Sequence, residues 1–169
     1  MVIVKYITLI LIFICSSYMG ILISKRYLYR VVELKEMKTA LNIFETKVKL
    51  TYQPIPQIFE EIAKKTKDNV SKIFQMASEH IKYKDAGTAW QESLNMVETN
   101  MNKEDIDTLK GLSNLLGKVN VEGQVSEIKL IDKFLDTQIE KAEQDRRKNE
   151  KMYKTLGVTV GLAIVIVLI

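Results

Sequence analysis

The residues of this sequence that could take part in chemistry do not form a catalytic group. His80, the only histidine, stands at the margin of an apolar helical face, where a single histidine is usually structural. Glu60 and Glu61 are adjacent, so on a helix their side chains point about 100° apart and cannot act on one substrate. The same holds for Glu104 and Asp105, and both pairs are typical of a solvated surface. Since the sequence also has no phosphate-binding glycine loop and no serine or cysteine placed as a nucleophile, we predict no enzyme, no cofactor and no metal site.

Two glycines predict a contact between helices. Gly157 and Gly161 are four residues apart in an uncharged stretch, so they lie on one face of a helix and would let a second helix approach closely. The alternative is a coincidence in a segment that tolerates glycine. Trp90, the only tryptophan, stands at helical spacing with other apolar residues, and we assign it to a core before any binding site.

The element that must position these glycines is an apolar C-terminal segment. From Thr155 onward the sequence holds fifteen residues without a charge, which as a helix reach about 22 Å. Met152 and Tyr153, with the ammonium of Lys154 extended to the headgroups, bring the length to about 27 Å, close to the thickness of a hydrocarbon core. We therefore predict a transmembrane helix over residues 152–169. The alternative is a buried core helix or a terminal strand.

The N-terminal end is also apolar. Tyr6 to Ser24 are nineteen residues without a charge, enough for about 28 Å of helix, and predict a transmembrane helix within residues 1–24. The competing interpretation is a secretory signal that is cleaved, which needs a basic segment before the apolar core. Here only Lys5 precedes the core, and Lys25 and Arg26 follow it at once. The sequence does not decide whether this span is ever cleaved.

The basic residues predict the orientation of both spans. Of the 25 Lys and Arg residues, 24 lie between Lys25 and Lys154, and they are dense beside the spans. Positively charged flanks stay on the cytoplasmic side, so we expect residues 25–151 in the cytoplasm and both termini outside it. The flanking residues are Lys25, Arg26 and Arg30 after the first span and Arg146, Arg147, Lys148, Lys151 and Lys154 before the second.

The middle of the chain has the size of one domain. It contains all 21 acidic residues, well mixed with basic ones, and no basic stripe with interleaved aromatics that would indicate a nucleic-acid surface. The excess positive charge lies at the flanks, where anionic lipid is the available partner. Residues 25–151 contain no cysteine, which excludes disulfides and thiolate metal sites there.

Every apolar pattern in this domain has a helical period, and alternation typical of strands never persists. A long first helix has Glu33 on its wet side and ends before Pro54 and Pro56. Further helices are expected at residues 58–62 and 70–81. A turn at Asp85–Gly87 and a capping box of Thr88 with Gln91 should precede the fourth.

Asn102 is expected to cap a fifth helix that reaches Leu116 and stops at Gly117. Neither proline nor glycine occurs from Val125 to Leu156, so the last helix should run directly into the second span. The predicted fold is all-α, an antiparallel cytoplasmic bundle of about six helices between two transmembrane helices. Its predicted core residues are Leu41, Phe44, Phe74, Trp90, Leu94, Leu109, Leu116 and Leu135.

Several short stretches resemble the stage III sporulation protein AB family of endospore-forming bacteria. They are an apolar start closing on Gly20 with a basic pair soon after, the Pro-Ile-Pro turn at 54–56, AWQESL at 89–94, Leu-Gly at 116–117 followed by Gly-Gln at 123–124, and NEKMYKTLG at 149–157. The last is the most specific, and together they extend over nearly the full length. Asn120 departs from the family pattern, which has an aspartate in this segment.

The resemblance implies a subunit of the channel complex that links the mother cell and the forespore. It implies a cytoplasmic bundle similar to the platform protein of type II secretion and type IV pilus machines, in the mother cell membrane facing the forespore. It implies no catalysis. The expected partners are an ATPase, stage III sporulation protein AA, other membrane proteins of the same complex and the lipid membrane, and a homo-oligomer is left open.

A second function fits the same features. A helical bundle tethered to the membrane for signalling, or an adaptor unrelated to secretion, would also need two anchors and a helical body. The physical pattern of the residues does not separate these classes, and only the resemblance favours the platform subunit.

Overall fold

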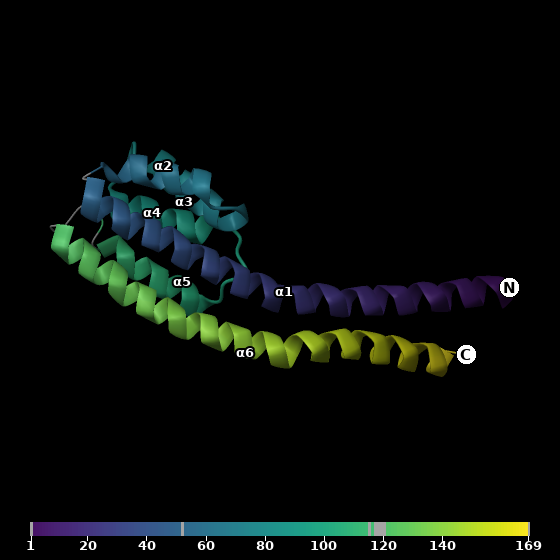
Figure 1. Ribbon diagram of the computed structural model, residues 1–169. Coiled ribbons are helices and arrows are strands. Elements are labelled where there is room, and N and C mark those ends of the chain that lie inside the picture. The colour runs from purple at the N-terminus through teal and green to yellow at the C-terminus, as the bar shows by residue number, and fades with distance from the viewer. Residues whose placement is uncertain (1, 52, 115, 117–120, 169) are drawn as a thin grey trace. The chain divides into compact units, whose positions relative to one another are not determined.

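The computed structural model describes residues 2–51, 53–114, 116 and 121–168, and these residues form helices joined by short turns, with no strand among them. The helices are α1 (Val2–Thr51), α2 (Ile55–Lys65), α3 (Asp68–His80), α4 (Ala86–Met96), α5 (Lys103–Lys110) and α6 (Val121–Leu168), with a 3-10 helix at Gly111–Asn114 (Figure 1). The predicted all-α class is confirmed. Gly117, the predicted helix stop, and Asn120 lie outside the described residues.

The chain divides into two compact units, residues 1–31 with 141–169 and residues 32–140. The predicted first span and first bundle helix are one helix, α1, because no proline interrupts residues 2–51. Likewise α6 continues without a break into the C-terminal apolar segment. The limits predicted for the spans, at residues 24 and 152, concern the lipid phase and stay predictions.

The start of α4 differs from the expected capping box. Its N-cap is Asp85, whose carboxylate accepts hydrogen bonds from the backbone N–H of Thr88 at 3.0 Å and from the Thr88 hydroxyl at 2.6 Å. An aspartate caps a helix at least as well as a threonine, and Asp85 stands three residues before Thr88. The helix α4 therefore begins at Ala86, and Gly87 lies inside it rather than in a turn. A Cβ on Gly87 would lie 2.3 Å from the carbonyl oxygen of Ser113, so only glycine fits there.

The predicted cap of α5 is confirmed, but the predicted length of this helix is wrong. The Asn102 side chain accepts from the Asp105 N–H at 2.8 Å, and the Asp105 carboxylate accepts from the Asn102 N–H at 2.8 Å, which completes a capping box. The helix ends at Lys110 rather than continuing toward Leu116. Gly111 disfavours helix, and the Ser113 hydroxyl donates to the Lys110 carbonyl at 2.7 Å, so the chain tightens into a 3-10 turn.

The core of the unit formed by residues 32–140 is an aromatic cluster. Phe59 contacts Phe44, Phe74 and Trp90 with ring centroids 5.4–5.7 Å apart, and Phe74 and Trp90 are 5.1 Å apart. The indole Nε1 of Trp90 donates to the carbonyl oxygen of Leu109 at 2.8 Å, which satisfies its polar atom in the interior. The structure buries all eight residues assigned to the core, namely Leu41, Phe44, Phe74, Trp90, Leu94, Leu109, Leu116 and Leu135.

Glu33, expected on the wet side of the first helix, is buried instead, with 7% of its surface exposed. Its carboxylate accepts hydrogen bonds from the Asn69 side chain at 2.8 Å and from the backbone and side chain of Asn100 at 2.6 and 2.7 Å. These contacts join α1 to the start of α3 and to the turn before α5. A charged residue can be buried when its oxygens are satisfied in this way, and the spacing of apolar residues carries no sign of it.

We expect a fragment of about residues 27–148 to be soluble and helical. In this fragment Trp90→Ala should lower the free energy of unfolding by about 3–5 kcal/mol, because it removes the largest buried side chain. Trp90→Phe is the matched control. It keeps a ring in the cluster and leaves only the Leu109 carbonyl without its donor, so about 1–3 kcal/mol should be lost. Urea unfolding followed by far-ultraviolet circular dichroism measures both. Unchanged stability of the alanine variant would contradict a core role, and substantial strand signal would contradict the fold.

Candidate functional site

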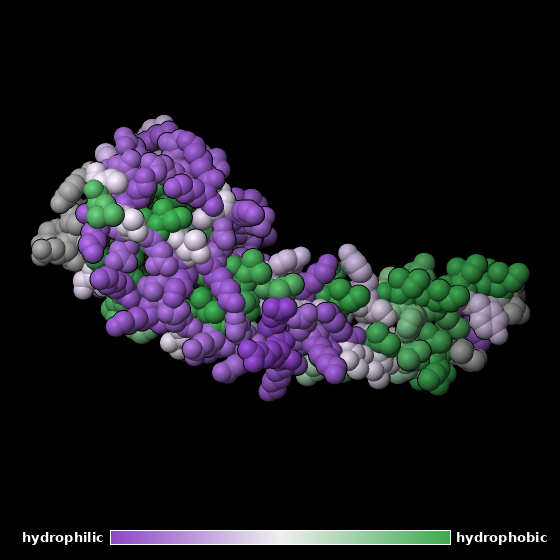
Figure 2. Space-filling model, viewed as in Figure 1, coloured by the Kyte–Doolittle hydropathy of each residue, from purple (hydrophilic) through white to green (hydrophobic). Residues whose placement is uncertain are grey.

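The unit formed by residues 1–31 and 141–169 carries the apolar ends of α1 and α6. Both helices are long and apolar enough to cross a membrane. Their apolar windows are only 17% and 11% buried, so these segments differ from the core helices of a soluble protein, and Figure 2 shows their side chains as a hydrophobic surface. An exposed apolar surface of this extent needs lipid or protein around it. The finding supports membrane association of this unit.

The backbones of the two apolar segments touch at glycines. A Cβ on Gly157 would lie 2.9 Å from both the Gly20 Cα and the Ser16 carbonyl oxygen, and a Cβ on Gly20 would lie 2.6 Å from the Tyr153 carbonyl oxygen. A Cβ on Gly161 would lie 3.0 Å from a ring carbon of Phe13. The structure thus places both predicted packing glycines against α1.

Gly20 and Ser16 complete this contact, and sequence reasoning did not assign them to it. The Ser16 hydroxyl donates to the Gly157 carbonyl oxygen at 2.8 Å, a hydrogen bond between the two helices. Hydrogen bonds of this kind between apolar helices contribute about 0.6–2 kcal/mol. The glycine at position 20 was visible as the only one in the N-terminal apolar stretch, but its partner lies 137 residues away in the sequence.

Just outside the apolar segments, polar contacts join α1 and α6 within the same unit. The rings of Tyr27 and Tyr153 stack with centroids 5.7 Å apart and 17° between their planes. Arg30 Nη1 lies 2.9 Å from Asp145 Oδ2, and only 8% of Arg30 is exposed. Arg30 is therefore buried and paired with the half-exposed carboxylate of Asp145, although it was expected as a cation flanking the membrane.

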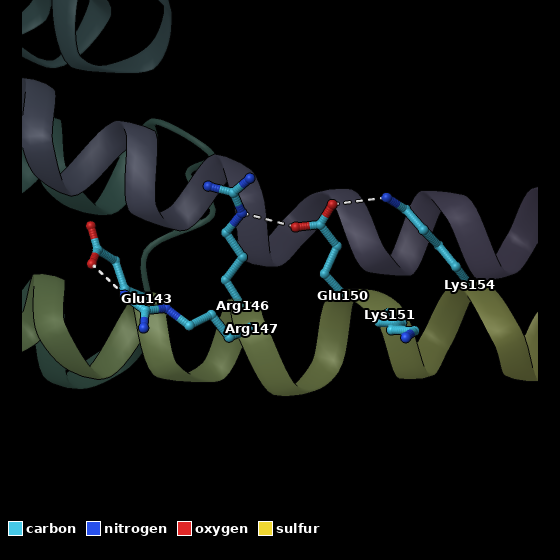
Figure 3. A pocket seen from close by; sticks show the side chains of 6 residues that line it. All are labelled: Glu143, Arg146, Arg147, Glu150, Lys151 and Lys154. Carbon is cyan, nitrogen blue, oxygen red and sulfur yellow. Dashed lines mark hydrogen bonds and ion pairs between the residues drawn. The ribbon is translucent and has the colours of Figure 1, made fainter.

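Six charged residues of α6 line a groove that we call the basic face (Figure 3). They form two rows with a spacing of four residues, one of Glu143, Arg147 and Lys151 and one of Arg146, Glu150 and Lys154. All six fall within about 140° of the helix circumference, because each residue turns the helix by about 100°. The face carries four cations and two carboxylates, an excess of two positive charges.

Glu150 binds two of these cations. Its carboxylate oxygens lie 2.8 Å from Lys154 Nζ and 2.8 Å from Arg146 Nε (Figure 3). The hydrogen bond from Lys154, followed by that from Arg146, lowers the pKa of Glu150 below its ordinary value. Glu150 therefore stays ionised to a lower pH than a free glutamate does, and it holds the two cations in place.

The remaining cations of the face are less strongly paired. Arg147 Nη2 lies 3.7 Å from Glu143 Oε2, beyond the distance of a good charge-assisted hydrogen bond, and the Arg147 side chain is 82% exposed. Lys151 has no ion pair within the described part of the chain. The same is true of the other flanking cations Lys25, Arg26 and Lys148.

Charge is distributed unevenly between the two units. Residues 1–31 and 141–169 contain ten Lys and Arg against three Asp and Glu, a formal net charge of +7. Residues 32–140 contain fifteen against eighteen, a formal net charge of −3. The positive charge of the protein is thus concentrated in the unit with the apolar segments.

The residues first considered for chemistry lie elsewhere, beside charged side chains or in a cap. His80 Nδ1 is 3.2 Å from Glu92 Oε2, Glu60 pairs with Lys64 at 2.7 Å, and Glu61 pairs with Lys47 at 2.6 Å. Asp105, expected on a solvated surface, is fully buried in the capping box of α5, because its carboxylate satisfies the Asn102 N–H. No group of three or more potential metal ligands occurs among the described residues.

Comparisons with known proteins agree on one family. Residues 5–169 match the sequence model of the family described as stage III sporulation protein AB. The chain is 30% identical over 168 residues to the stage III sporulation protein AB of Bacillus subtilis (strain 168). The aligned region covers 97% of this chain and 98% of that protein. It is also similar to the solved structure of a stage III sporulation protein AB, with a TM-score of 0.65 and 25% identity over 71% of this chain and 98% of that chain.

Gly157→Ala should destabilise the full-length protein in detergent by about 1–3 kcal/mol, because the new Cβ meets backbone atoms that cannot move independently. Gly161→Ala should cost less, since its nearest neighbour is the Phe13 ring, which can rotate. Gly111→Ala is the control without a steric clash, because nothing lies within 4 Å of the added carbon, and it should leave the stability unchanged or raise it by up to about 1 kcal/mol. Thermal unfolding measures the three variants. Equal melting temperatures for the variants at positions 157 and 111 would show that the helices do not pack at Gly157.

Proposed function

Because the chain belongs to the stage III sporulation protein AB family, we propose that it is a non-enzymatic platform subunit of the channel complex between mother cell and forespore. In this proposal it lies in the mother cell membrane facing the forespore. Its helical bundle meets a cytoplasmic ATPase, and its apolar helices meet the membrane proteins of the same complex. The chain would thereby couple the ATPase to the membrane assembly.

The observation that carries the proposal is that the apolar ends of α1 and α6 form one compact unit with their backbones in contact at Gly20 and Gly157. Two spans that pack together place both termini on one side of the membrane and the residues between them on the other. The intervening 109 residues, 32–140, then form a body on a single side, which is what a platform needs.

The basic flanks support the choice of side. Residues 1–31 and 141–169 carry a formal net charge of +7, and nine of their ten basic residues lie between the two apolar segments in sequence. Segments with this bias are retained in the cytoplasm. A cytoplasmic bundle is required for any contact with a cytoplasmic ATPase.

The bundle also offers an exposed apolar pair as a contact surface for that ATPase. Leu130 and Phe134 are one turn apart on α6, and 45% and 51% of their surfaces are exposed. A leucine and a phenylalanine that share one face of a helix are typical anchors for a partner, since large apolar side chains at the centre of an interface contribute much of its binding energy.

The orientation can be measured with alkaline phosphatase, which is active only outside the cytoplasm. Fused after Ile169 it should be active, and inserted between Tyr83 and Lys84, in the turn after α3, it should be inactive. A fluorescent protein that matures only in the cytoplasm, placed at the same two positions, should give the opposite pattern. If the phosphatase is active only in the turn after α3, the bundle is extracytoplasmic and the proposed contact with an ATPase is wrong.

The proposed partner can be captured in sporulating cells with a photo-crosslinking amino acid at position 134. We expect a crosslink to the ATPase of the complex, stage III sporulation protein AA. Position 83 is the matched control, because Tyr83 is 88% exposed but has no comparable apolar neighbour on a shared helical face. Mass spectrometry identifies the captured protein. Capture of unrelated signalling proteins from position 134, without the ATPase, would favour a membrane-tethered adaptor.

A further inference from the structure

We propose that the basic face of α6 binds the phosphate group of an anionic phospholipid headgroup. This inference rests on the proposed membrane location and adds a defined ligand to it. The basic face has four cations and two carboxylates, which leaves an excess of two positive charges. Together the six residues line a groove with a volume of about 470 Å³. That volume lies within the range of small-ligand sites, about 300–1,000 Å³.

The depth of the face along α6 matches the headgroup layer. At about 1.5 Å per residue, Lys154 and Lys151 stand about 1.5 and 6 Å before Thr155, where the uncharged run begins. The headgroup region of one leaflet is about 5–8 Å thick. Arg147 stands about 12 Å before Thr155, and its long side chain can extend back toward the lipid. Lys151 and Lys154 are therefore at the level of lipid phosphates, and Arg147 lies beyond this layer with its side chain able to reach it.

The pairing within the face leaves cations available to a ligand. Arg147 is only loosely held by Glu143, at 3.7 Å, and Lys151 has no ion pair in the described part of the chain. Glu150 fixes Arg146 and Lys154 beside them. Glu150 thus holds Arg146 and Lys154, and the other row carries Arg147 and Lys151, whose positions in the chain are one turn apart on α6. In Figure 3 the Arg147 guanidinium points toward Glu143, and Lys151 lies farther along the helix.

This set of donors fits a phosphate. The guanidinium of an arginine can donate two parallel hydrogen bonds to phosphate oxygens, and a lysine ammonium adds a compact charge. The net charge of +7 on the unit that contains the face draws anionic lipid toward it in preference to zwitterionic lipid. A soluble phosphate has the same chemistry, but the position beside the uncharged run favours a headgroup.

The preference can be measured on the full-length protein reconstituted in vesicles of phosphatidylcholine that contain spin-labelled phosphatidylglycerol or spin-labelled phosphatidylcholine. The ratio of the two association constants reports selectivity. We expect the wild-type protein to select phosphatidylglycerol, and Lys151→Gln to reduce the ratio about fivefold, the effect of one cation near a charged surface. Lys151→Arg should retain the preference.

Lys148→Gln is the matched control, because Lys148 is one turn from Lys151 on the same helix and does not line the groove. It makes the same change of charge at nearly the same depth, so a small effect at position 148 with a large one at 151 supports a site. Equal losses at both positions would mean diffuse attraction and overturn the proposal.

The source of the phosphate is tested in the same vesicles. Inorganic phosphate added in excess over the labelled lipid should leave the selectivity unchanged, and displacement of the lipid would overturn the headgroup assignment in favour of a soluble anion. A wild-type protein without selectivity would overturn the site altogether. These results do not depend on the channel role, whose failure would appear separately in the crosslinking at position 134.

Discussion

The contact between Gly20 and Gly157 is the constraint on which the unit formed by residues 1–31 and 141–169 depends. Apolar side chains do not draw helices together in lipid, because the surrounding chains are equally apolar. What remains is close packing and hydrogen bonding, and both occur here, since two glycines bring the backbones together and Ser16 donates to the Gly157 carbonyl. The Tyr27–Tyr153 stack and the Arg30–Asp145 pair then fix the helices beyond the apolar segments.

The periodicity of apolar residues predicts most of the bundle, because a helix that buries one face must repeat its apolar residues every three or four positions. Phe44, Phe74 and Trp90 follow this rule and are buried. The rule does not account for polar burial. Glu33 and Asp105 are inside because nearby N–H groups satisfy their oxygens, and those partners come from distant segments or from a cap whose geometry is set locally.

The boundaries of helices depend on competition between neighbouring groups. Asn102 was predicted as the cap of α5, and this is confirmed, whereas its capping box with Asp105 was not predicted. For α4, Asp85 and Thr88 were both able to cap, and Asp85 caps the helix through the backbone N–H of Thr88, while the close contact of Gly87 with the Ser113 carbonyl is formed only in the folded unit. Such contacts lie beyond the reach of local sequence patterns.

For the candidate site, residue types could be predicted but pairing could not. The flanking cations all follow from their position beside the apolar segments, yet Arg30 is bound by Asp145 while Lys151 is not bound by any carboxylate of the described residues. The difference comes from the position of each residue around the axis of α6. Asp145 lies on the side that meets α1, and Lys151 lies on the basic face. The same helix can therefore pack against α1 along one side and leave cations exposed along another.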